Sequence, residues 1–327
     1  MAMSQQQYIF VCTNPGNEIL LKEEIKIFYP ELVLSFSKKG FVTFKNTGVS
    51  YDLKTISQLQ LTFATRSGIF YGKSTPENIV SDVKASGLDS EDFMIHSFAI
   101  GCETDFDAQA AFGREINEYS AEGKIVIDLV SLGPNEIWFG AHCVANGCTR
   151  YPNSMVEIET PENAVSKGYL KLFQILKLYA VKLFKGDLWL DFGCAPGGAS
   201  QLLLDEGCKV VGIDPAKISP AVAIHKNFSH MKRSVQDLSH EDLPEDVRWI
   251  HADININPKQ SIKEVLRLAK KYNRTLKGII FTVQVVKMEY IENIESFEDQ
   301  FYDWGFHNII SRQIPSHKKE YVIIATR

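Results

Sequence analysis

Glycines and carboxylates gather at two expected strand ends in the carboxyl-terminal half of the chain. The stretch Asp191-Phe-Gly-Cys-Ala-Pro-Gly-Gly-Ala199 follows the apolar run Leu188-Trp-Leu190 and precedes the helix-like Ser200-Gln-Leu-Leu-Leu204. A strand, a glycine-rich turn and a helix let a nucleoside-bearing ligand approach the backbone closely at the carboxyl end of a sheet. A second apolar strand, Val210-Val-Gly-Ile213, ends in Asp214. This acid follows Asp191 by about the 20 residues expected of a ribose-binding carboxylate.

The turn differs from the loops that hold pyrophosphate. It does not have the GxGxxG spacing, and it lacks the GK[ST] sequence of a phosphate-binding loop. Asp191, the turn glycines and Asp214 nevertheless indicate an adenosine cofactor. S-adenosylmethionine fits this combination better than a dinucleotide, because it has no phosphate to hold.

Two further acids follow expected strands. Asp237 is placed to accept a hydrogen bond from an adenine amino group. The alternative interpretation of this residue is a helix cap or a solvated loop acid. Asp253 ends the strand-like Trp249-Ile-His-Ala-Asp-Ile254, next to where a sulfonium would lie. A carboxylate at the end of an apolar strand is costly unless it is paired, which favours a functional role. His251, on the same strand, is expected to be a partnered structural histidine and not a base.

The composition is that of a soluble globular protein with two or three domains. The chain has 327 residues, of which 45% are hydrophobic and 23% charged. No apolar run approaches the roughly 18 residues that span a bilayer, and the polar start is not a signal peptide, so we expect a cytoplasmic protein without a membrane partner. The six cysteines are scattered. Only Cys143 and Cys148 lie close together, beside His142, which is too few ligands for zinc, so we expect free thiols and no metal.

The charge distribution does not indicate a nucleic-acid partner. The net charge is −5, with 12 basic and 18 acidic residues in residues 1–150 and 23 basic and 22 acidic residues in residues 151–327. If the protein binds RNA, it therefore needs a local basic patch and not a global field.

The periodicity predicts an α/β chain. Residues 1–75 and 76–150 are expected to form two small α+β units, the second with a helix over 107–121. Residues 146–163 are expected to be a linker, and the clearest helix is predicted over 164–185. Beyond it, strands are predicted at 188–193, 209–214, 233–236, 248–254, 277–284, 306–312 and 320–326, alternating with helices at 199–206, 217–226, 259–272 and 288–302. This alternation predicts a doubly wound, seven-stranded Rossmann-like sheet.

One further motif carries a family resemblance. Ser166-Lys-Gly-Tyr-Leu-Lys-Leu172, ahead of Asp191-Phe-Gly-Cys-Ala-Pro-Gly-Gly198, resembles the FtsJ-like (Rossmann) ribose 2'-O-methyltransferases. Within that family the chain is most similar to the bacterial large-subunit ribosomal RNA methyltransferase M group. The resemblance implies a ferredoxin-like domain over 1–75, a THUMP-like RNA-binding domain over 76–150 and a methyltransferase domain over 151–327. It also implies that the partner is ribosomal RNA or a pre-ribosomal particle, and we expect a monomer.

The resemblance also implies functional residues. The family works with a Lys-Asp-Lys-Glu set, in which Lys171, Asp253 and Glu320 match the first, second and fourth positions. Gln284 stands where the family has its second lysine, and Lys287 follows three residues later. The cofactor-binding positions implied by the motifs are Ser166, Gly193, Cys194, Ala195, Pro196, Gly197, Gly198, Asp214, Asp237 and Asp253.

The departure at Gln284 leaves three possibilities open. Lys287 substitutes for the missing lysine, Lys171 carries more of the work, or the protein binds cofactor without rapid turnover.

From the resemblance we expect S-adenosylmethionine-dependent methyl transfer to a ribose 2'-hydroxyl of RNA. The alternatives are a catalytically weak or inactive RNA- and cofactor-binding protein and a methyltransferase with a non-ribose acceptor. Asp253-Ile-Asn-Ile-Asn-Pro258 is not an Asn-Pro-Pro-aromatic motif, which argues against methylation of an adenine amino group.

Overall fold

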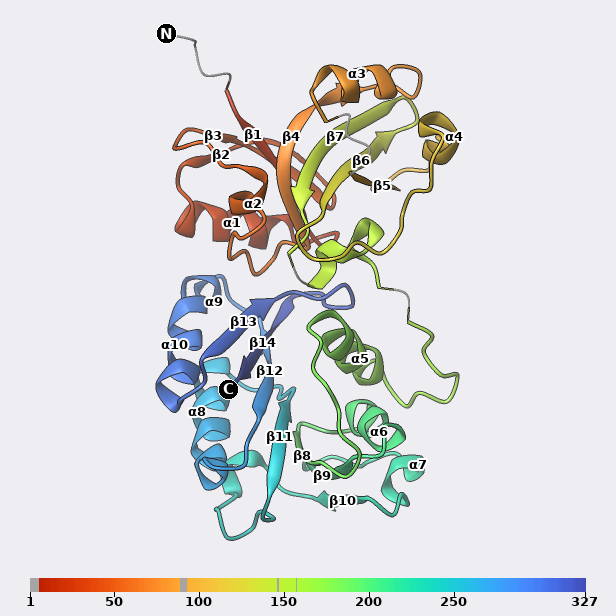
Figure 1. The fold of residues 1–327 in the computed structure, drawn as a ribbon. Helices are drawn as coiled ribbons and strands as arrows, with labels where there is room; N and C mark the ends of the chain where they lie inside the picture. Colours follow the sequence, from red (N-terminus) through yellow and green to blue (C-terminus); the bar gives the residue numbers. More distant parts are fainter. Residues whose placement is uncertain (1–5, 89–92, 146, 157) are drawn as a thin grey trace. The chain divides into compact units, whose positions relative to one another are not determined.

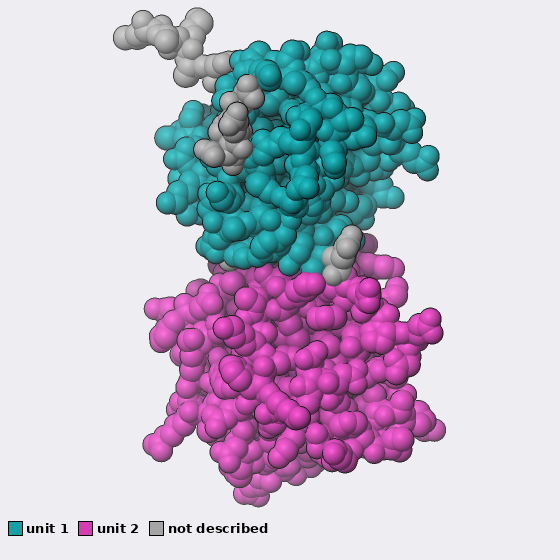
Figure 2. Space-filling view, turned by 45° about the vertical axis from the view of Figure 1, so that its right-hand side comes forward, with its two compact units in different colours: residues 1–156 teal, residues 157–327 magenta. Residues whose placement is uncertain are grey.

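The computed structural model describes residues 6–88, 93–145, 147–156 and 158–327. Its internal contacts divide the chain into two units, residues 1–156 and residues 157–327 (Figure 2). Each unit is built around one seven-stranded sheet. None of the helices in the described residues is long and apolar enough to cross a membrane.

The first unit has strands of both expected amino-terminal domains in one sheet. Its strand order is β2-β3-β1-β4-β7-β6-β5, in which β5 and β6 run parallel and the other neighbours antiparallel. Helix α3 packs Ile79 and Val83 against Ile127 and Leu129 on one face of this sheet. Its division into a ferredoxin-like and a THUMP-like domain stays a prediction. The elements are β1 (Tyr8–Cys12), α1 (Glu18–Phe28), β2 (Leu32–Lys38), β3 (Phe41–Asn46), α2 (Leu53–Ile56), β4 (Arg66–Ser74), α3 (Ile79–Ala85), β5 (Met94–Ala99), α4 (Ala108–Phe112), β6 (Ile125–Gly133), β7 (Glu136–Cys143) and the 3-10 turns η1 (Gly147–Arg150) and η2 (Pro152–Ser154).

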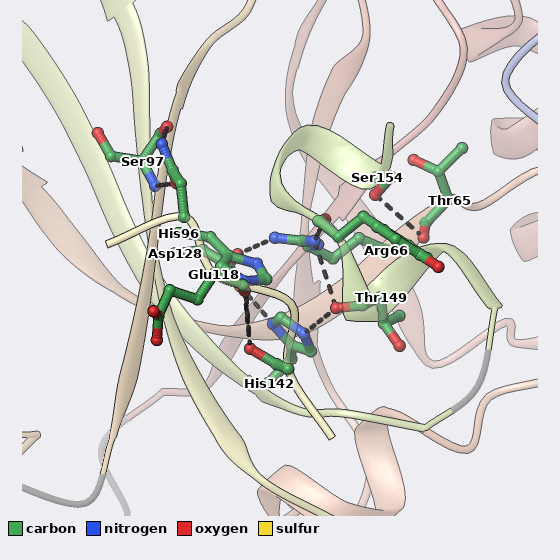
Figure 3. A network of polar contacts seen from close by, with 12 residues as sticks. Thr65, Arg66, His96, Ser97, Glu118, Asp128, His142, Thr149 and Ser154 are labelled. Atoms are coloured by element: carbon green, nitrogen blue, oxygen red, sulfur yellow. Dashed lines mark hydrogen bonds and ion pairs between the residues drawn. The ribbon is translucent and has the colours of Figure 1, made fainter. Parts of the chain in front are cut away.

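A buried polar network holds the end of the first unit onto its sheet. Arg66 of β4 forms an ion pair with Asp128 of β6, whose second carboxylate oxygen lies 2.6 Å from His142 Nδ1 (Figure 3). Arg66 also donates to the backbone carbonyls of Thr149 and Tyr151. The Arg66, Asp128 and His142 side chains are fully buried. Because each buried charge has an opposite charge or a carbonyl beside it, the network avoids the large cost of an isolated buried ion.

The second unit is a doubly wound α/β domain. Its strand order is β10-β9-β8-β11-β12-β14-β13, parallel except for β14, which pairs antiparallel with β12 and β13. Helices α8 and α10 lie on one face of the sheet, and α5 and α6 lie on the other (Figure 1). The elements are α5 (Gly168–Leu178), β8 (Leu188–Phe192), α6 (Gly198–Asp205), β9 (Lys209–Ile213), α7 (Pro220–Ala223), β10 (Phe228–Met231), η3 (Val235–Asp237), β11 (Val247–Ala252), α8 (Pro258–Ala269), η4 (Lys270–Tyr272), β12 (Gly278–Gln284), α9 (Glu289–Glu292), α10 (Ile294–Trp304), β13 (Asn308–Arg312) and β14 (Glu320–Thr326).

Several predicted elements were wrong in extent or place. The helix expected over 217–226 is only α7, and the helix expected over 288–302 is two helices, α9 and α10. The helix expected over 107–121 is only α4, because Gly113 ends it in the left-handed conformation with φ 63°. The helix expected over 164–185 is α5, which ends before Ala180 turns to φ 51°. The strand expected at 233–236 is β10, because Phe228 to Met231 pair with β9. Residues 235–237 form the 3-10 turn η3 instead.

Candidate active site

The turn after β8 brings the ends of three strands together. Gly193 has φ 77°, and a Cβ on it would lie 2.2 Å from the carbonyl oxygen of Asp253. Its amide donates to the carbonyl of Ile213, and the amide of Asp253 donates to the carbonyl of Phe192. Only glycine fits such a close approach with a positive φ. The turn therefore places Asp214 and Asp253 on either side of Gly193.

A pocket opens at these strand ends. It has a volume of about 290 Å³ and is lined by Gly193, Ala195, Ile213, Asp214, Pro215, Arg233, Ser234, Val235, Asp253, Ile254, Asn255 and Ile256. The half-buried carboxylate of Asp214 is fixed in its wall, since one oxygen accepts from the Ala195 amide at 3.1 Å and the other from the Ala216 amide at 2.7 Å. A carboxylate has about four lone-pair positions, so Asp214 can still accept from two ligand hydroxyls.

Four side chains form a closed polar ring beside the pocket, which we call the ring: Lys171, Asp253, Gln284 and Glu320. Lys171 Nζ lies 2.8 Å from Glu320 Oε1 and 3.5 Å from Asp253 Oδ2. The Gln284 amide donates to Glu320 Oε2 at 2.7 Å and to Asp253 Oδ1 at 3.3 Å. Lys171 comes from α5, and β12 and β14 are adjacent antiparallel strands that place Gln284 directly opposite Glu320. Asp253 belongs to both the ring and the pocket wall.

The ring shifts the pKa values of Lys171 and Glu320. Burial alone would lower the pKa of Lys171, but the charge of Asp253 and the hydrogen bond with Glu320 outweigh it and raise that pKa above its usual 10.5. Burial would raise the pKa of Glu320, but Lys171, His317 and Gln284 lower it below its usual 4.5. Lys171 is therefore a cation and Glu320 an anion near neutral pH.

A buried pair, Asp191 and His251, lies on the adjacent strands β8 and β11 that lead to the pocket. Asp191 is fully buried, accepts from Ser200 Oγ at 2.5 Å and lies 2.7 Å from His251 Nδ1. Burial would lower the pKa of His251, but the Asp191 carboxylate raises it above its usual value. His251 is thus the partnered histidine that its strand position predicts. Its partner Asp191 lies in β8, accepts from Ser200 of α6 and does not line the pocket.

The other residues expected at the site lie in different surroundings. Ser166 packs on the turn, since a Cβ on Gly198 would lie 2.2 Å from its Oγ. Gly197 precedes α6 with φ 119°, and Pro196 is exposed. The buried Cys194 thiol approaches β9, where a Cβ on Gly212 would lie 2.8 Å from Sγ, and burial raises the pKa of that thiol.

Asp237 and Lys287 are placed apart from these contacts. Asp237 is exposed on η3 and does not line the pocket. Lys287 is exposed, and within the described residues its side chain forms no hydrogen bond or ion pair. The adenine-binding role of Asp237 stays a prediction.

Sequence reasoning missed most of the pocket wall. Arg233, Ser234 and Val235 follow β10, whose predicted position was wrong, so their place at a strand end was not visible. Ile254 to Ile256 directly follow Asp253, and the end of β11 was a usable signal for them.

A family match lies within the second unit. Residues 164–323 match the family of FtsJ-like methyltransferases. A ribosomal RNA large subunit methyltransferase M of Halorhodospira halophila (strain DSM 244 / SL1) is 28% identical over 123 residues, which cover 36% of this chain and 35% of that protein. The match thus spans about a third of the relative's length.

Three solved structures show a weak similarity to this chain. A putative ribosomal RNA methyltransferase from Plasmodium falciparum is 16% identical with a TM-score of 0.38 and covers 50% of this chain and 97% of its own. A putative hemolysin from Lactococcus lactis is 15% identical with a TM-score of 0.41 and covers 51% of this chain and 89% of its own. TrmN from Thermus thermophilus is 12% identical with a TM-score of 0.36 and covers 98% of this chain and 100% of its own.

Proposed function

Because residues 164–323 belong to the FtsJ-like methyltransferase family, we propose that this protein transfers a methyl group from S-adenosylmethionine to a ribose 2'-hydroxyl of large-subunit ribosomal RNA. The observation that carries the proposal is the double position of Asp253. One carboxylate lines a pocket for a nucleoside and also contacts Lys171 and Gln284 of the ring. A methyl donor in the pocket and an acceptor hydroxyl at the ring would therefore meet at this residue.

The pocket suits this cofactor in shape and charge. The missing Cβ of Gly193 leaves the turn close to the backbone of Asp253, and Asp214 presents free lone pairs for ribose hydroxyls. Two carboxylates, Asp214 and Asp253, line this pocket. They favour a ligand that carries a positive charge. When bound, S-adenosylmethionine supplies a methyl group on a sulfonium sulfur.

The ring can take up the proton that the acceptor hydroxyl must lose. A ribose hydroxyl is a poor nucleophile and must lose its proton as the methyl arrives. Lys171 cannot accept it, because its raised pKa keeps it protonated, but its charge stabilises the developing alkoxide. Gln284 cannot accept a proton either. We assign proton acceptance to Asp253, whose side chain is 26% exposed against 9% for Glu320 and which lines the pocket.

We propose that Gln284 occupies the position that the second lysine of the family set would take. Its amide donates to the two carboxylates that Lys171 also contacts. The exposed Lys287 is not required to complete the ring. Of the three possibilities that the sequence left open, we favour the one in which Lys171 carries more of the work, as the cation that stabilises the alkoxide, while Asp253 accepts the proton.

The first unit would position the RNA. We propose that it comprises the ferredoxin-like and THUMP-like domains that the family resemblance implies, and that the protein acts as a monomer. With ribosomal RNA as its substrate, the protein would act in the cytoplasm, on free RNA or on a pre-ribosomal particle.

The acceptor atom can be tested with alkali. Labelled methyl groups from S-adenosylmethionine are transferred to ribosomal RNA, which is then hydrolysed completely with base. A 2'-O-methyl group removes the hydroxyl that attacks the next phosphodiester, so the label should appear in alkali-resistant dinucleotides. Label in mononucleotides would indicate a base as acceptor, and label in protein would indicate a protein acceptor. Either result would contradict the proposal.

A further inference from the structure

Basic and apolar side chains border the ring along the chain. We call this set the rim: Lys167, Val286, Lys287, Met288 and Lys319. Lys167 lies one helical turn before Lys171, whose amide donates to its carbonyl at 3.0 Å. The other members lie beside Gln284 and Glu320, since the Val285 amide donates to the carbonyl of Lys319 at 2.8 Å. All five are exposed.

The lysines of the rim give the site a local positive field. The ring itself holds one cation and two carboxylates, so the rim reverses the sign of charge around it. The next acid along the loop, Glu289, lies 3.9 Å from Lys259, which offsets its charge. In a protein with a net charge of −5, such a cluster is a specific feature and not part of a general basic surface. A polyanion fits it.

The apolar members distinguish between polyanions. Val286 is 71% and Met288 41% exposed, although both are hydrophobic and both flank a lysine. An acidic protein would gain little from these side chains. An unstacked nucleobase offers a flat apolar face, and proteins that act on single nucleotides pack such faces on aromatic or apolar side chains.

We propose that the rim binds single-stranded RNA, with the lysines on phosphates that flank the target nucleotide and Val286 and Met288 against an unstacked base. The inference rests on the proposed function, because it places the ribose of that nucleotide at the ring. It adds the residues that recognise the substrate and the form of the substrate, a nucleotide outside a duplex.

The test compares salt dependence in three variants of the full-length protein. Binding of a labelled single-stranded RNA of roughly 12 nucleotides is measured over a range of salt concentrations. Lys287→Gln/Lys319→Gln should bind several-fold more weakly, and the slope of log K against log salt should fall by about 0.7 for each lost phosphate contact. Val286→Ser/Met288→Ser should bind more weakly at every salt concentration with an unchanged slope. Lys209→Gln/Lys270→Gln, with both changes outside the rim, is the matched control.

Separate outcomes bear on the rim and on the proposed function. Wild-type affinity and slope in the lysine variant would overturn the rim proposal. So would equally tight binding of a polyglutamate peptide of the same charge, which has no bases. S-adenosylmethionine affinity is measured on the same proteins by calorimetry. If the cofactor binds and RNA does not, the rim proposal fails alone, whereas failure of the wild-type protein to bind cofactor would contradict the proposed function.

Discussion

Lys171 and Gln284 bridge the same two carboxylates, yet only Lys171 carries charge. An amine between two carboxylates is held protonated, and an amide neither gains nor loses a proton as an acid or base near neutral pH. In the proposed reaction, the ring orients the acceptor and stabilises negative charge, while a carboxylate takes the proton.

Removal of the ring cation should affect turnover more than cofactor binding. Lys171→Met keeps most of the side-chain volume but removes the charge that faces the developing alkoxide. We expect the methylation rate to fall by about 100-fold or more, measured in single turnover. The affinity for S-adenosylmethionine should stay within a few-fold of wild type, and a loss of cofactor affinity as large as the loss of rate would contradict this role.

The stability that the ring provides should depend on pH at both extremes. Glu320 has a lowered pKa, so its contribution is present above 4.5 and is lost as the pH falls through the lowered value. Lys171 has a raised pKa, so its contribution is present below 10.5 and is lost as the pH rises through the raised value. The difference in unfolding free energy between wild type and Lys171→Met should therefore be flat near neutrality and shrink at both ends. Urea titrations at several pH values measure it, and a monotonic change through neutrality would disagree.

Asp214 should be a determinant of cofactor affinity. Asp214→Ala removes a carboxylate held by two backbone amides in the pocket wall. We expect S-adenosylmethionine to bind more weakly by the worth of one or two charge-assisted hydrogen bonds, about 1.5–3 kcal/mol each, by calorimetry. Asp237→Ala tests the predicted adenine-binding role of an acid that is exposed and does not line the pocket. An equal loss in both variants would support that role, and unchanged affinity in Asp214→Ala would remove Asp214 from the cofactor site.

The turn between β8 and α6 matters because it lets three strand ends approach each other. Gly193→Ala would force a Cβ to within 2.2 Å of the Asp253 carbonyl oxygen in addition to the strain of φ 77°. Gly186 has φ 89°, and a Cβ on it would meet nothing within 4 Å, so Gly186→Ala isolates the backbone strain. We expect about 1–2 kcal/mol for that strain and a larger destabilisation for Gly193→Ala, with loss of cofactor binding. Equal unfolding free energies for the two variants would contradict the close approach.

The sequence predicted these elements unevenly, for physical reasons. Strands β8, β9, β11, β12 and β14 are rich in apolar residues, and such segments identify strands of a sheet that is covered on both faces well. Strand β10, Phe-Ser-His-Met, carries no such run, and it was misplaced together with the pocket wall that follows it. Helix α4 ends at Gly113, and the apolar periodicity used to predict the helix does not take such a glycine into account.

The ring shows the same limit on sequence reasoning at the site. Lys171, Asp253 and Glu320 were identifiable from the family motif. The contact of the Gln284 amide with both carboxylates depends on the register of β12 and β14, which the sequence does not show.

At the scale of the whole molecule, the two units have separate cores and should respond separately. Cofactor binding stabilises only the unit that holds the pocket, by about 2.7 kcal/mol at 100 times the dissociation constant. Asp128→Ala leaves Arg66 buried without its counter-charge and should destabilise the first unit by about 3–5 kcal/mol. Calorimetry should show two transitions, one raised by S-adenosylmethionine and the other lowered by Asp128→Ala. A single transition that moves with both changes would show that the units unfold together.

The proposed activity is tested most directly by its product, a 2'-O-methylated nucleoside. Ribosomal RNA from a strain that lacks the gene is incubated with S-adenosylmethionine and wild-type, Lys171→Ala or Lys287→Ala protein at saturating RNA, and its nucleosides are identified by mass spectrometry. We expect a 2'-O-methylated nucleoside with wild type and Lys287→Ala and its loss with Lys171→Ala. No methylated nucleoside from RNA at any maturation stage, with cofactor still bound, would contradict the account and indicate an RNA- and cofactor-binding protein in which Gln284 has ended catalysis.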